Sequence, residues 1–211
     1  MSFDIDIMLS RGDSPITARF VAPGGLVALV APSGAGKTTT LDMIAGLVRP
    51  TRGRIAVSGQ VLFDAAAGID LAPHQRACGY VFQDIRLFPH RNVRDNLLYG
   101  WRLAPPDRRW MGLDEACAFL GIGHLLDRRP ATLSGGEAQR VAIGRALLAG
   151  PRFLLMDEPL TSLDGPRREE IIPVITRIRD ELGLPILYVS HDRAEVGRLA
   201  SHVLGLMGPD Y

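Results

Sequence analysis

A loop of small residues near the start of the chain carries one cationic side chain with a hydroxyl beside it. The loop has the sequence Ala-Pro-Ser-Gly-Ala-Gly-Lys-Thr-Thr and ends where a helix is expected to begin. Backbone N–H groups in so small a loop can point at phosphate oxygens, and the positive end of the helix dipole strengthens their attraction. Lys37 would reach the terminal phosphates of a nucleotide, and the Thr38 hydroxyl would ligate Mg²⁺. The residues predicted to bind the nucleotide are Ala31, Pro32, Ser33, Gly34, Ala35, Gly36, Lys37, Thr38 and Thr39.

The first position of this loop departs from the strict phosphate-loop pattern, because Ala31 replaces the glycine expected six residues before the lysine. Alanine fits there if its backbone has φ below zero, since only a positive φ demands glycine. Lys37 is the only lysine in the chain, which has 24 lysines and arginines in all. A single ammonium in this loop indicates a site that needs a compact point charge and not a planar guanidinium. The alternative is a glycine-rich turn that binds no ligand.

Two adjacent acidic residues follow an apolar run at positions 153–156. The run is typical of a buried strand, and ligands in open α/β sheets bind at the carboxyl ends of the strands. Asp157 is therefore placed to hold Mg²⁺, directly or through water. Glu158 is placed to activate or orient a water for attack on the γ-phosphate of a bound nucleotide. The alternative is a solvated turn that contains two acids.

A third segment, Leu-Ser-Gly-Gly-Glu at positions 133–137, precedes an apolar helical stretch. Ser134 and Glu137 have the spacing of a capping box, in which each side chain bonds to the backbone N–H of the other residue. A capping box does not explain Gly135 and Gly136, because glycine in the first turn of a helix lowers helix stability. Two glycines at this place would let a phosphate approach the backbone closely.

The segments that hold these residues alternate between strands and helices. Strands are expected at 26–30, 153–156, 186–190 and 203–207, and helices at 40–47, 166–182 and 193–200. Strands that alternate with helices predict an α/β fold with a parallel sheet.

The rest of the chain predicts two additions to this core. Residues 1–7 are expected to form an edge strand, and 54–59 with 61–64 a hairpin. Residues 84–150 have helical periodicity, with one helical unit expected at 114–126. The predicted fold is a single domain over the whole chain. It is an α/β P-loop NTPase (RecA-like) core with a mostly parallel sheet, an N-terminal antiparallel β subdomain and an inserted α-helical subdomain at about 84–150.

The composition is that of a globular protein without an electrostatic footprint for nucleic acid. The net charge of the 211 residues is +1, so no nucleic acid partner is expected. Cys78 and Cys117 are far apart in sequence, which favours free thiols in a reducing compartment. The N-terminus does not resemble a signal peptide, and no apolar run approaches the roughly 18–20 residues that span a bilayer. A soluble cytoplasmic protein is expected, with any membrane role through a partner.

The order of these motifs resembles that of the ABC ATPases. Leu-Ser-Gly-Gly-Glu, between the Lys37 loop and the Asp157 strand, is similar to the signature motif of that family. Three further positions match family loops in the family's order. Gln83 matches the Q-loop, Asp164 in Ser-Leu-Asp matches the D-loop, and His191 matches the H-loop. The resemblance covers essentially the whole chain.

The resemblance implies a head-to-tail homodimer in which ATP lies between the Lys37 loop of one copy and the signature of the other. Glu158 would act as catalytic base, His191 would contact the γ-phosphate, and Gln83 would sense Mg²⁺ and the attacking water. Asp164 would link the two sites across the interface. The signature residues expected at the γ-phosphate of the partner copy are Ser134, Gly135, Gly136 and Glu137. The expected Mg²⁺ ligands are Thr38, Gln83 and Asp157.

The resemblance also implies partners beyond a second copy of the chain. The family docks on an integral-membrane permease and works indirectly with a periplasmic solute-binding protein. The expected location is therefore cytoplasmic, peripheral on the inner face of the cell membrane.

Stretches around Gln83 and in the helical segment are similar to the ATPase subunit of bacterial molybdate importers. They are residues 61–64, 68–76, 79–90, 93–97, 99–100, 125–130 and 187–191. This likeness implies uptake of molybdate or tungstate, and the alternative solutes are sulfate, a polyamine or thiamine. A non-transport ABC ATPase that acts on nucleic acid would need a basic surface or a long insertion. A catalytically inactive binding module would not need the intact Lys37, Asp157, Glu158 and His191.

The chain departs from this subgroup in two places. Residues 9–17 contain no aromatic side chain that could stack on adenine, so other contacts are expected to bind the base. The oxyanion-binding regulatory domain that usually follows in the subgroup is also missing. Either a truncated chain or a short natural form without that domain is expected.

Overall fold

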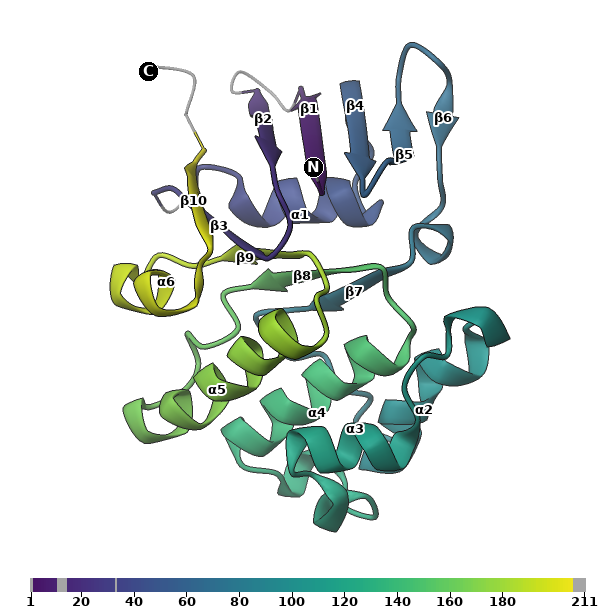
Figure 1. The fold of residues 1–211 in the computed structure, drawn as a ribbon, viewed down its shortest axis with the longest axis vertical. Helices are drawn as coiled ribbons and strands as arrows, with labels where there is room; N and C mark the ends of the chain where they lie inside the picture. Colours follow the sequence, from purple (N-terminus) through teal and green to yellow (C-terminus); the bar gives the residue numbers. More distant parts are fainter. Residues whose placement is uncertain (1, 11–14, 33, 207–211) are drawn as a thin grey trace.

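The computed structural model describes residues 2–10, 15–32 and 34–206, and that part of the chain contains two β-sheets and six α-helices (Figure 1). One sheet is antiparallel, with the order β2-β1-β4-β5-β6, and the other is parallel, with the order β10-β3-β9-β8-β7. The antiparallel strands are β1 (Phe3–Leu9), β2 (Ile16–Ala22), β4 (Arg52–Val57), β5 (Gln60–Asp64) and β6 (Ile69–Asp70). The parallel strands are β3 (Leu26–Val30), β7 (Cys78–Val81), β8 (Phe153–Asp157), β9 (Ile186–Val189) and β10 (His202–Gly205). The helices are α1 (Lys37–Ala45), α2 (Val93–Leu103), α3 (Leu113–Leu120), α4 (Gly135–Leu148), α5 (Gly165–Glu181) and α6 (Arg193–Leu199).

Strand β1 lies inside the antiparallel sheet, so the prediction of an edge strand at 1–7 is wrong. It pairs with β2 on one side and with β4 on the other. The alternation that buries Phe3, Ile5 and Ile7 indicates which face of the strand meets the core. That pattern is the same for central and edge strands. The second partner, β4, comes from beyond α1, and local sequence cannot predict this pairing.

Two other expectations concern turns. The predicted hairpin is confirmed, because β4 and β5 pair antiparallel around Ser58 and Gly59, which both have positive φ. The expected helical unit at 114–126 is wrong in its extent. Helix α3 ends at Gly121, whose backbone is left-handed with φ 65°, and a separate 3-10 turn follows. Glycine at this position lets the chain leave the helix at low cost.

The parallel sheet brings four loops to one edge. Strands β3, β9, β8 and β7 are neighbours in this order and run in the same direction. Their carboxyl ends lead, in the same order, to the phosphate loop, to His191, to the Asp157–Glu158 pair and to Gln83. Carboxyl ends of parallel strands meet at one edge of a sheet. Residues from four distant parts of the chain therefore converge there.

Two hydrophobic clusters cover the opposite faces of the parallel sheet. Along β8, Phe153 and Leu155 pack into the cluster that includes α1 and the antiparallel sheet, and Leu154 and Met156 pack into the cluster that includes α4 and α5. A strand buried on both faces needs a continuous apolar run, as β8 has. Figure 1 shows α1 between the two sheets, and α4 and α5 on the far side of the parallel sheet. Helix α1 is thus held from both sides, which fixes the loop at its N-terminus.

Helices α2, α3 and α4 form between β7 and β8, inside the segment 84–150 predicted to be helical. They pack closely around Gly144 of α4. A Cβ atom at Gly144 would lie 2.8 Å from side-chain atoms of Leu97 on α2 and Leu120 on α3. Only glycine leaves room for this approach. In the part of the chain that the structure describes, no helix has the length and apolar character that crossing a bilayer requires.

Arg76 is an unusual part of the core, because its side chain is only 1% exposed. Its Nη1 donates to the carbonyl oxygens of Met43 (2.8 Å) and Ile44 (3.0 Å), and its Nη2 donates to Asp70 Oδ1 (3.0 Å). Burial lowers the pKa of Arg76, and the charge of Asp70 opposes that shift. The last carbonyls of a helix have no partner within the helix. The guanidinium supplies one and therefore holds the C-terminal end of α1.

Replacing Arg76 with methionine is expected to lower the free energy of unfolding by about 3 kcal/mol, because it leaves helix carbonyls and Asp70 without their buried partner. Arg49 gives a matched control, since its Nε also meets Asp70 (3.2 Å) but its side chain is 76% exposed. The loss for Arg49→Met should be about 0.5 kcal/mol or less. Urea unfolding of both variants measures the difference, and equal losses would contradict the role given to Arg76.

Candidate functional site

The phosphate loop joins β3 to α1, as its sequence predicts, and its glycines have left-handed backbones. Ser33 of this loop lies outside the described residues. Gly34 and Gly36 are left-handed, with φ 82° and 84°, and Gly36 is the N-cap of α1. Among the described residues other than glycine, Ala31 is not one of those with positive φ. An alanine therefore fits at the first position of the loop without strain.

Lys37 lies folded over its own loop and is 6% exposed. Its Nζ donates to the carbonyl oxygens of Ala31 (2.8 Å) and Pro32 (3.1 Å). An ammonium has three donors, so these two bonds leave one for a ligand in the cavity that Lys37 lines. The only lysine of the chain is thus buried, and carbonyl oxygens of the phosphate loop bind its ammonium group beside the cavity.

Asp157 ends β8 beside Thr38, and its Oδ1 atom is buried without a hydrogen-bond partner among the described residues. Burial raises the pKa of Asp157, and the Thr38 hydroxyl opposes that shift. An unpartnered buried carboxylate oxygen costs free energy unless something binds it. Carboxylate, hydroxyl and amide oxygens are the ligands that Mg²⁺ prefers. The residues Asp157, Thr38 and Gln83, which line one cavity, therefore fit a Mg²⁺ ion.

Glu158 and His191 contact each other. His191 Nδ1 lies 3.1 Å from Glu158 Oε2, and the Thr161 hydroxyl donates to the same oxygen at 3.1 Å. Glu158 has a left-handed backbone with φ 44°, which is uncommon for a residue with a long side chain. Strain of this kind often occurs at functional sites, where the surroundings hold one side chain in one direction.

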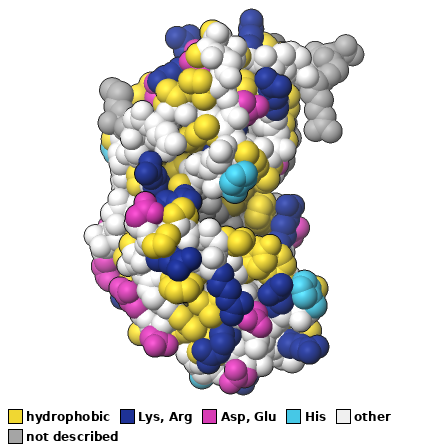
Figure 2. Space-filling model, turned by 90° about the vertical axis from the view of Figure 1, so that its right-hand side faces the viewer, with side chains coloured by type: hydrophobic (Ala, Val, Ile, Leu, Met, Phe, Trp, Pro, Cys, Tyr) yellow, Lys and Arg dark blue, Asp and Glu magenta, His cyan; other side chains and the backbone are white. Residues whose placement is uncertain are grey.

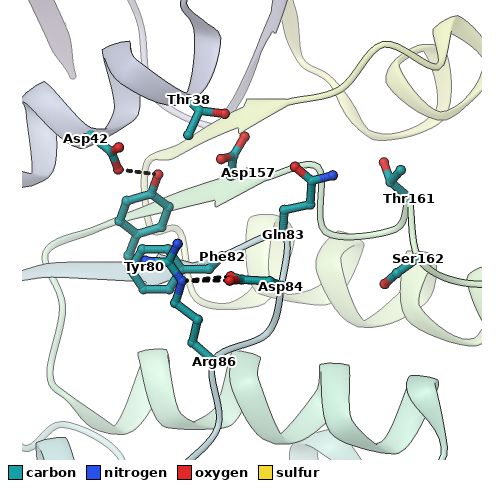
Figure 3. Close-up of a pocket in the computed structure, with 10 residues that line it drawn as sticks. All are labelled: Thr38, Asp42, Tyr80, Phe82, Gln83, Asp84, Arg86, Asp157, Thr161 and Ser162. Atoms are coloured by element: carbon teal, nitrogen blue, oxygen red, sulfur yellow. Dashed lines mark hydrogen bonds and ion pairs between the residues drawn. The ribbon is translucent and has the colours of Figure 1, made fainter.

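Two adjoining cavities connect these groups, and Thr38 and Gln83 line both. One, of about 400 Å³, lies against the phosphate loop and reaches Glu158; its lining residues are Ile16, Gly34, Gly36, Lys37, Thr38, Thr39, Gln83 and Glu158. The other, of about 410 Å³, is drawn in Figure 3, where Thr38, Asp157 and Gln83 surround a common space. The structure thus brings the predicted Lys37, Asp157, Glu158, Gln83 and His191 together at one edge of the sheet.

The predicted signature residues lie apart from this group. Ser134 and Glu137 form the expected capping box: Ser134 Oγ accepts from Glu137 N (3.2 Å), and Ser134 N donates to Glu137 Oε2 (2.7 Å). The bond from the Ser134 backbone lowers the pKa of Glu137. None of the residues 134–137 belongs to the described lining of the two cavities. Their neighbour is the predicted D-loop, since a Cβ atom at Gly135 would lie 3.2 Å from the Leu163 side chain.

Asp164 is the N-cap of α5, where its Oδ1 accepts from Arg167 N at 3.0 Å. Capping explains the residue type by itself. The position of Asp164, directly after Leu163 and so beside the signature, places both predicted interface motifs on the same part of the surface.

Three residues of the site escaped the sequence analysis. Thr161 follows Glu158 by three residues, and this spacing in a turn could have indicated their bond. Asp42 accepts a hydrogen bond from the Tyr80 hydroxyl at 3.0 Å. It lies one helical turn after Thr38 on α1, and both residues line the same cavity (Figure 3). Ile16 approaches the phosphate loop so closely that a Cβ atom at Gly36 would lie 2.6 Å from it. No local pattern predicts the last contact, because it depends on how β2 meets α1.

Known proteins resemble the chain over most of its length. A family model described as ABC transporter matches residues 19–161. The molybdenum import ATP-binding protein ModC of Mesorhizobium japonicum is 57% identical over 206 residues, which are 98% of this chain and 56% of that protein. The protein of the same name from Rhodospirillum rubrum is 56% identical over 197 residues, 93% of this chain and 53% of that protein. The chain spans about half the length of these curated relatives.

Solved structures agree with the predicted fold class, which is confirmed. A dimeric ATP-binding cassette in a post-hydrolysis state, bound to ADP and Pi, has a TM-score of 0.78 and 25% sequence identity. The match covers 98% of this chain and 94% of that chain. A second dimeric structure, of a bacterial ABC transporter cassette, has a TM-score of 0.77, 26% identity and coverage of 97% and 93%. The phosphate loop, the acidic pair and the His191 loop lie at one sheet edge, as the family resemblance implies. Because the family model also covers more than half of the sequence, the chain belongs to the ABC transporter family.

Proposed function

We propose that the chain is the ATP-hydrolysing subunit of an importer, and that the solute is molybdate. The observation that supports hydrolysis best is the contact of Glu158 with His191 next to the Lys37 loop. The identity of 57% to a protein named for molybdenum import supports the solute.

The described residues fit the needs of phosphoryl transfer to water, which are mainly positioning and charge neutralisation. Lys37 and the backbone N–H groups at the start of α1 bind the phosphates of ATP. Glu158 takes a proton from the attacking water. Among the described residues, His191 and Thr161 both contact Oε2 of Glu158, which leaves Oε1 for that water.

Mg²⁺ would be held by Thr38, Asp157 and Gln83. When bound, the ion neutralises charge on the phosphate oxygens and orients them. Asp157 meets such an ion with a buried carboxylate oxygen that has no other described partner.

A second copy of the chain completes the site in this proposal. Residues 134–137 do not line the cavities beside Lys37 in their own chain. The N-terminus of α4 carries Gly135 and Gly136, which have no side chain to keep a phosphate from the backbone N–H groups. In a head-to-tail dimer, Ser134, Gly135, Gly136 and Glu137 of one copy close over the nucleotide of the other. The resemblance to two dimeric cassettes supports this arrangement.

The membrane permease docks, in this proposal, on a groove beside α2. The groove has a volume of about 460 Å³ and is mainly apolar and aromatic, with two arginines; its lining residues are Cys78, Gly79, Tyr80, Phe82, Arg86, Phe88, Tyr99, Gly100, Arg145, Ala146 and Ala149. Figure 2 shows hydrophobic side chains interspersed with arginines on this side of the molecule. An apolar segment of the permease that carries a carboxylate would fit.

The groove adjoins the site of hydrolysis, because its residues Tyr80, Phe82 and Arg86 also line the cavity of Asp157. This docking gives the chain its place on the inner face of the cell membrane.

Replacing Tyr99 with alanine is expected to weaken co-purification with the permease about tenfold or more, because exposed aromatic anchors dominate interfaces. Trp110 gives a matched control. Both side chains are 41% exposed, but Trp110 does not belong to the described lining of the groove. Trp110→Ala should keep the permease, and both variants should keep the ATPase rate of the isolated chain. Equal recovery of the permease with both variants would contradict docking at this groove.

The solute is tested by reconstituting the chain with candidate permeases and binding proteins in vesicles. ATP hydrolysis and uptake are measured with molybdate, tungstate, sulfate, a polyamine and thiamine. Molybdate-loaded binding protein is expected to stimulate hydrolysis and uptake. Stimulation by sulfate, polyamine or thiamine without any by molybdate or tungstate would overturn the assignment of the solute.

A further inference from the structure

Arg168, in the first turns of α5, reaches two loops that are distant in sequence. Its Nη1 donates to Asp192 Oδ2 at 3.1 Å, and its Nη2 donates to the carbonyl oxygen of Leu163 at 3.4 Å. Its Nε atom is buried without a partner among the described residues. A partly buried guanidinium with an unsatisfied donor costs folding free energy. Arg168 is therefore unlike an arginine in an exposed surface ion pair, and a role for its two bonds has to be sought.

Asp192 makes further hydrogen bonds besides the one to Arg168. Its Oδ1 accepts from the backbone N–H groups of Ala194 (2.9 Å) and Glu195 (3.2 Å), which makes it the N-cap of α6. Its own N–H donates to Ser190 Oγ at 3.0 Å. One carboxylate oxygen thus serves the helix and the other serves Arg168. His191 lies between Ser190 and Asp192, so a shift of Asp192 moves the backbone of His191.

The contacts close a ring around the segment that follows β8. At one end of that segment, Glu158 meets His191. At the other end, the carbonyl oxygen of Leu163 meets Arg168, which meets Asp192, the neighbour of His191. The segment 158–163 and the segment 190–192 are therefore joined at two places. Among the described hydrogen bonds of the ring, only the Arg168 side chain contacts both Leu163 and Asp192.

We propose that Arg168 is a positioning residue, which couples the loop of Asp164 to the contact between His191 and Glu158. Asp164 follows Leu163 directly, so a displacement of Asp164 by a second copy of the chain moves the carbonyl oxygen that Arg168 holds. Arg168 passes this displacement to Asp192 and so to His191. Dimer closure then sets the position of the catalytic pair through a single guanidinium. The inference rests on the proposed function, since it takes Glu158 and His191 as catalytic residues.

Arg168→Met is expected to lower kcat for ATP about tenfold or more and to change KM for ATP less than about twofold, because small misplacements of catalytic groups affect turnover more than binding. Arg198 gives a matched control. It joins the same two helices through Glu169, with distances of 2.5 and 2.8 Å, and contacts neither loop in the described structure. Arg198→Met should keep kcat within about twofold.

Two further variants separate positioning from folding. Lysine keeps the charge but lacks the planar fork that spans the two acceptors, so Arg168→Lys should give an intermediate kcat. Asp192→Asn keeps an N-cap side chain, and adding it to Arg168→Met should cause little further loss, because both changes break the same link. Thermal unfolding of each variant shows whether it is folded. If Arg168→Met does not fold, Arg168→Lys decides.

The results have distinct meanings. A wild-type chain without ATPase activity would overturn the proposed function. An active wild-type chain with unchanged kcat in Arg168→Lys and Arg168→Met would overturn the role of Arg168. The same kcat loss in Arg168→Met and Arg198→Met would also overturn it, since the effect would then come from the packing of α5 on α6.

Discussion

The Glu158→Gln variant is expected to bind ATP with the affinity of the parent chain and to lose ATP turnover by a factor of about 10² to 10⁴, the range that a general base contributes. Glutamine keeps the shape of the side chain and can still contact Thr161 and His191. It cannot accept the proton of the attacking water. Since Glu158 lines the cavity of the phosphate loop without donating to a phosphate, binding should survive. Steady-state phosphate release and calorimetric titration with ATP measure the two effects.

The control for this variant is Glu181→Gln. Glu181 is a glutamate paired with Arg177 on the exposed side of α5 (2.7 Å), away from both cavities. Its turnover should stay within about twofold of the parent, as for other surface ion pairs. Turnover of Glu158→Gln close to that of the parent would remove Glu158 from the role of base.

The Lys37→Ala variant is expected to lose ATP affinity by a factor of about 10 to 10², because a charged hydrogen bond to a phosphate contributes about 1.5–3 kcal/mol. The loss has a second cause. The carbonyl oxygens of Ala31 and Pro32 lose the donor that binds both of them within the loop. Calorimetric titration with ATP measures the affinity.

Lys37→Arg shows whether charge alone suffices. A planar guanidinium is wider than an ammonium and does not fit the two carbonyl oxygens of the loop in the same way. Arginine should therefore restore little of the affinity, although the rest of the chain uses arginine for every cation. Unchanged affinity in Lys37→Ala would contradict the phosphate-loop interpretation.

Much of the fold and of the site could be predicted from the sequence, because their signals are local. An apolar run, a loop of small residues and a helix start in direct succession predicted the strand, loop and helix around Lys37. Acids at the end of an apolar run predicted the place of Asp157 and Glu158. Alternating strands and helices predicted a parallel sheet, and parallel strands bring their carboxyl ends together.

The remaining features depend on contacts between distant segments. The central position of β1 requires β4, which follows α1 in the sequence. The burial of Arg76 depends on α1 ending beside it, and an arginine in a polar stretch gives no sign of that. Arg168 is one of two adjacent arginines, and only the fold distinguishes it from Arg167, whose side chain pairs with Asp164 at 3.6 Å. Periodicity predicts which face of an element is buried, but not which partner covers it.

The central claim is that ATP closes two copies of the chain over a site that neither copy completes alone. Light scattering of Glu158→Gln, in which hydrolysis cannot reopen the dimer, tests this claim most directly. With ATP and Mg²⁺ the mass should be that of two chains, and with ADP that of one. Adding Gly135→Asp, which places a carboxylate against the partner's phosphates, should keep the chain monomeric with ATP. A mass of one chain for Glu158→Gln, at an ATP concentration that calorimetry shows to be saturating, would contradict the claim.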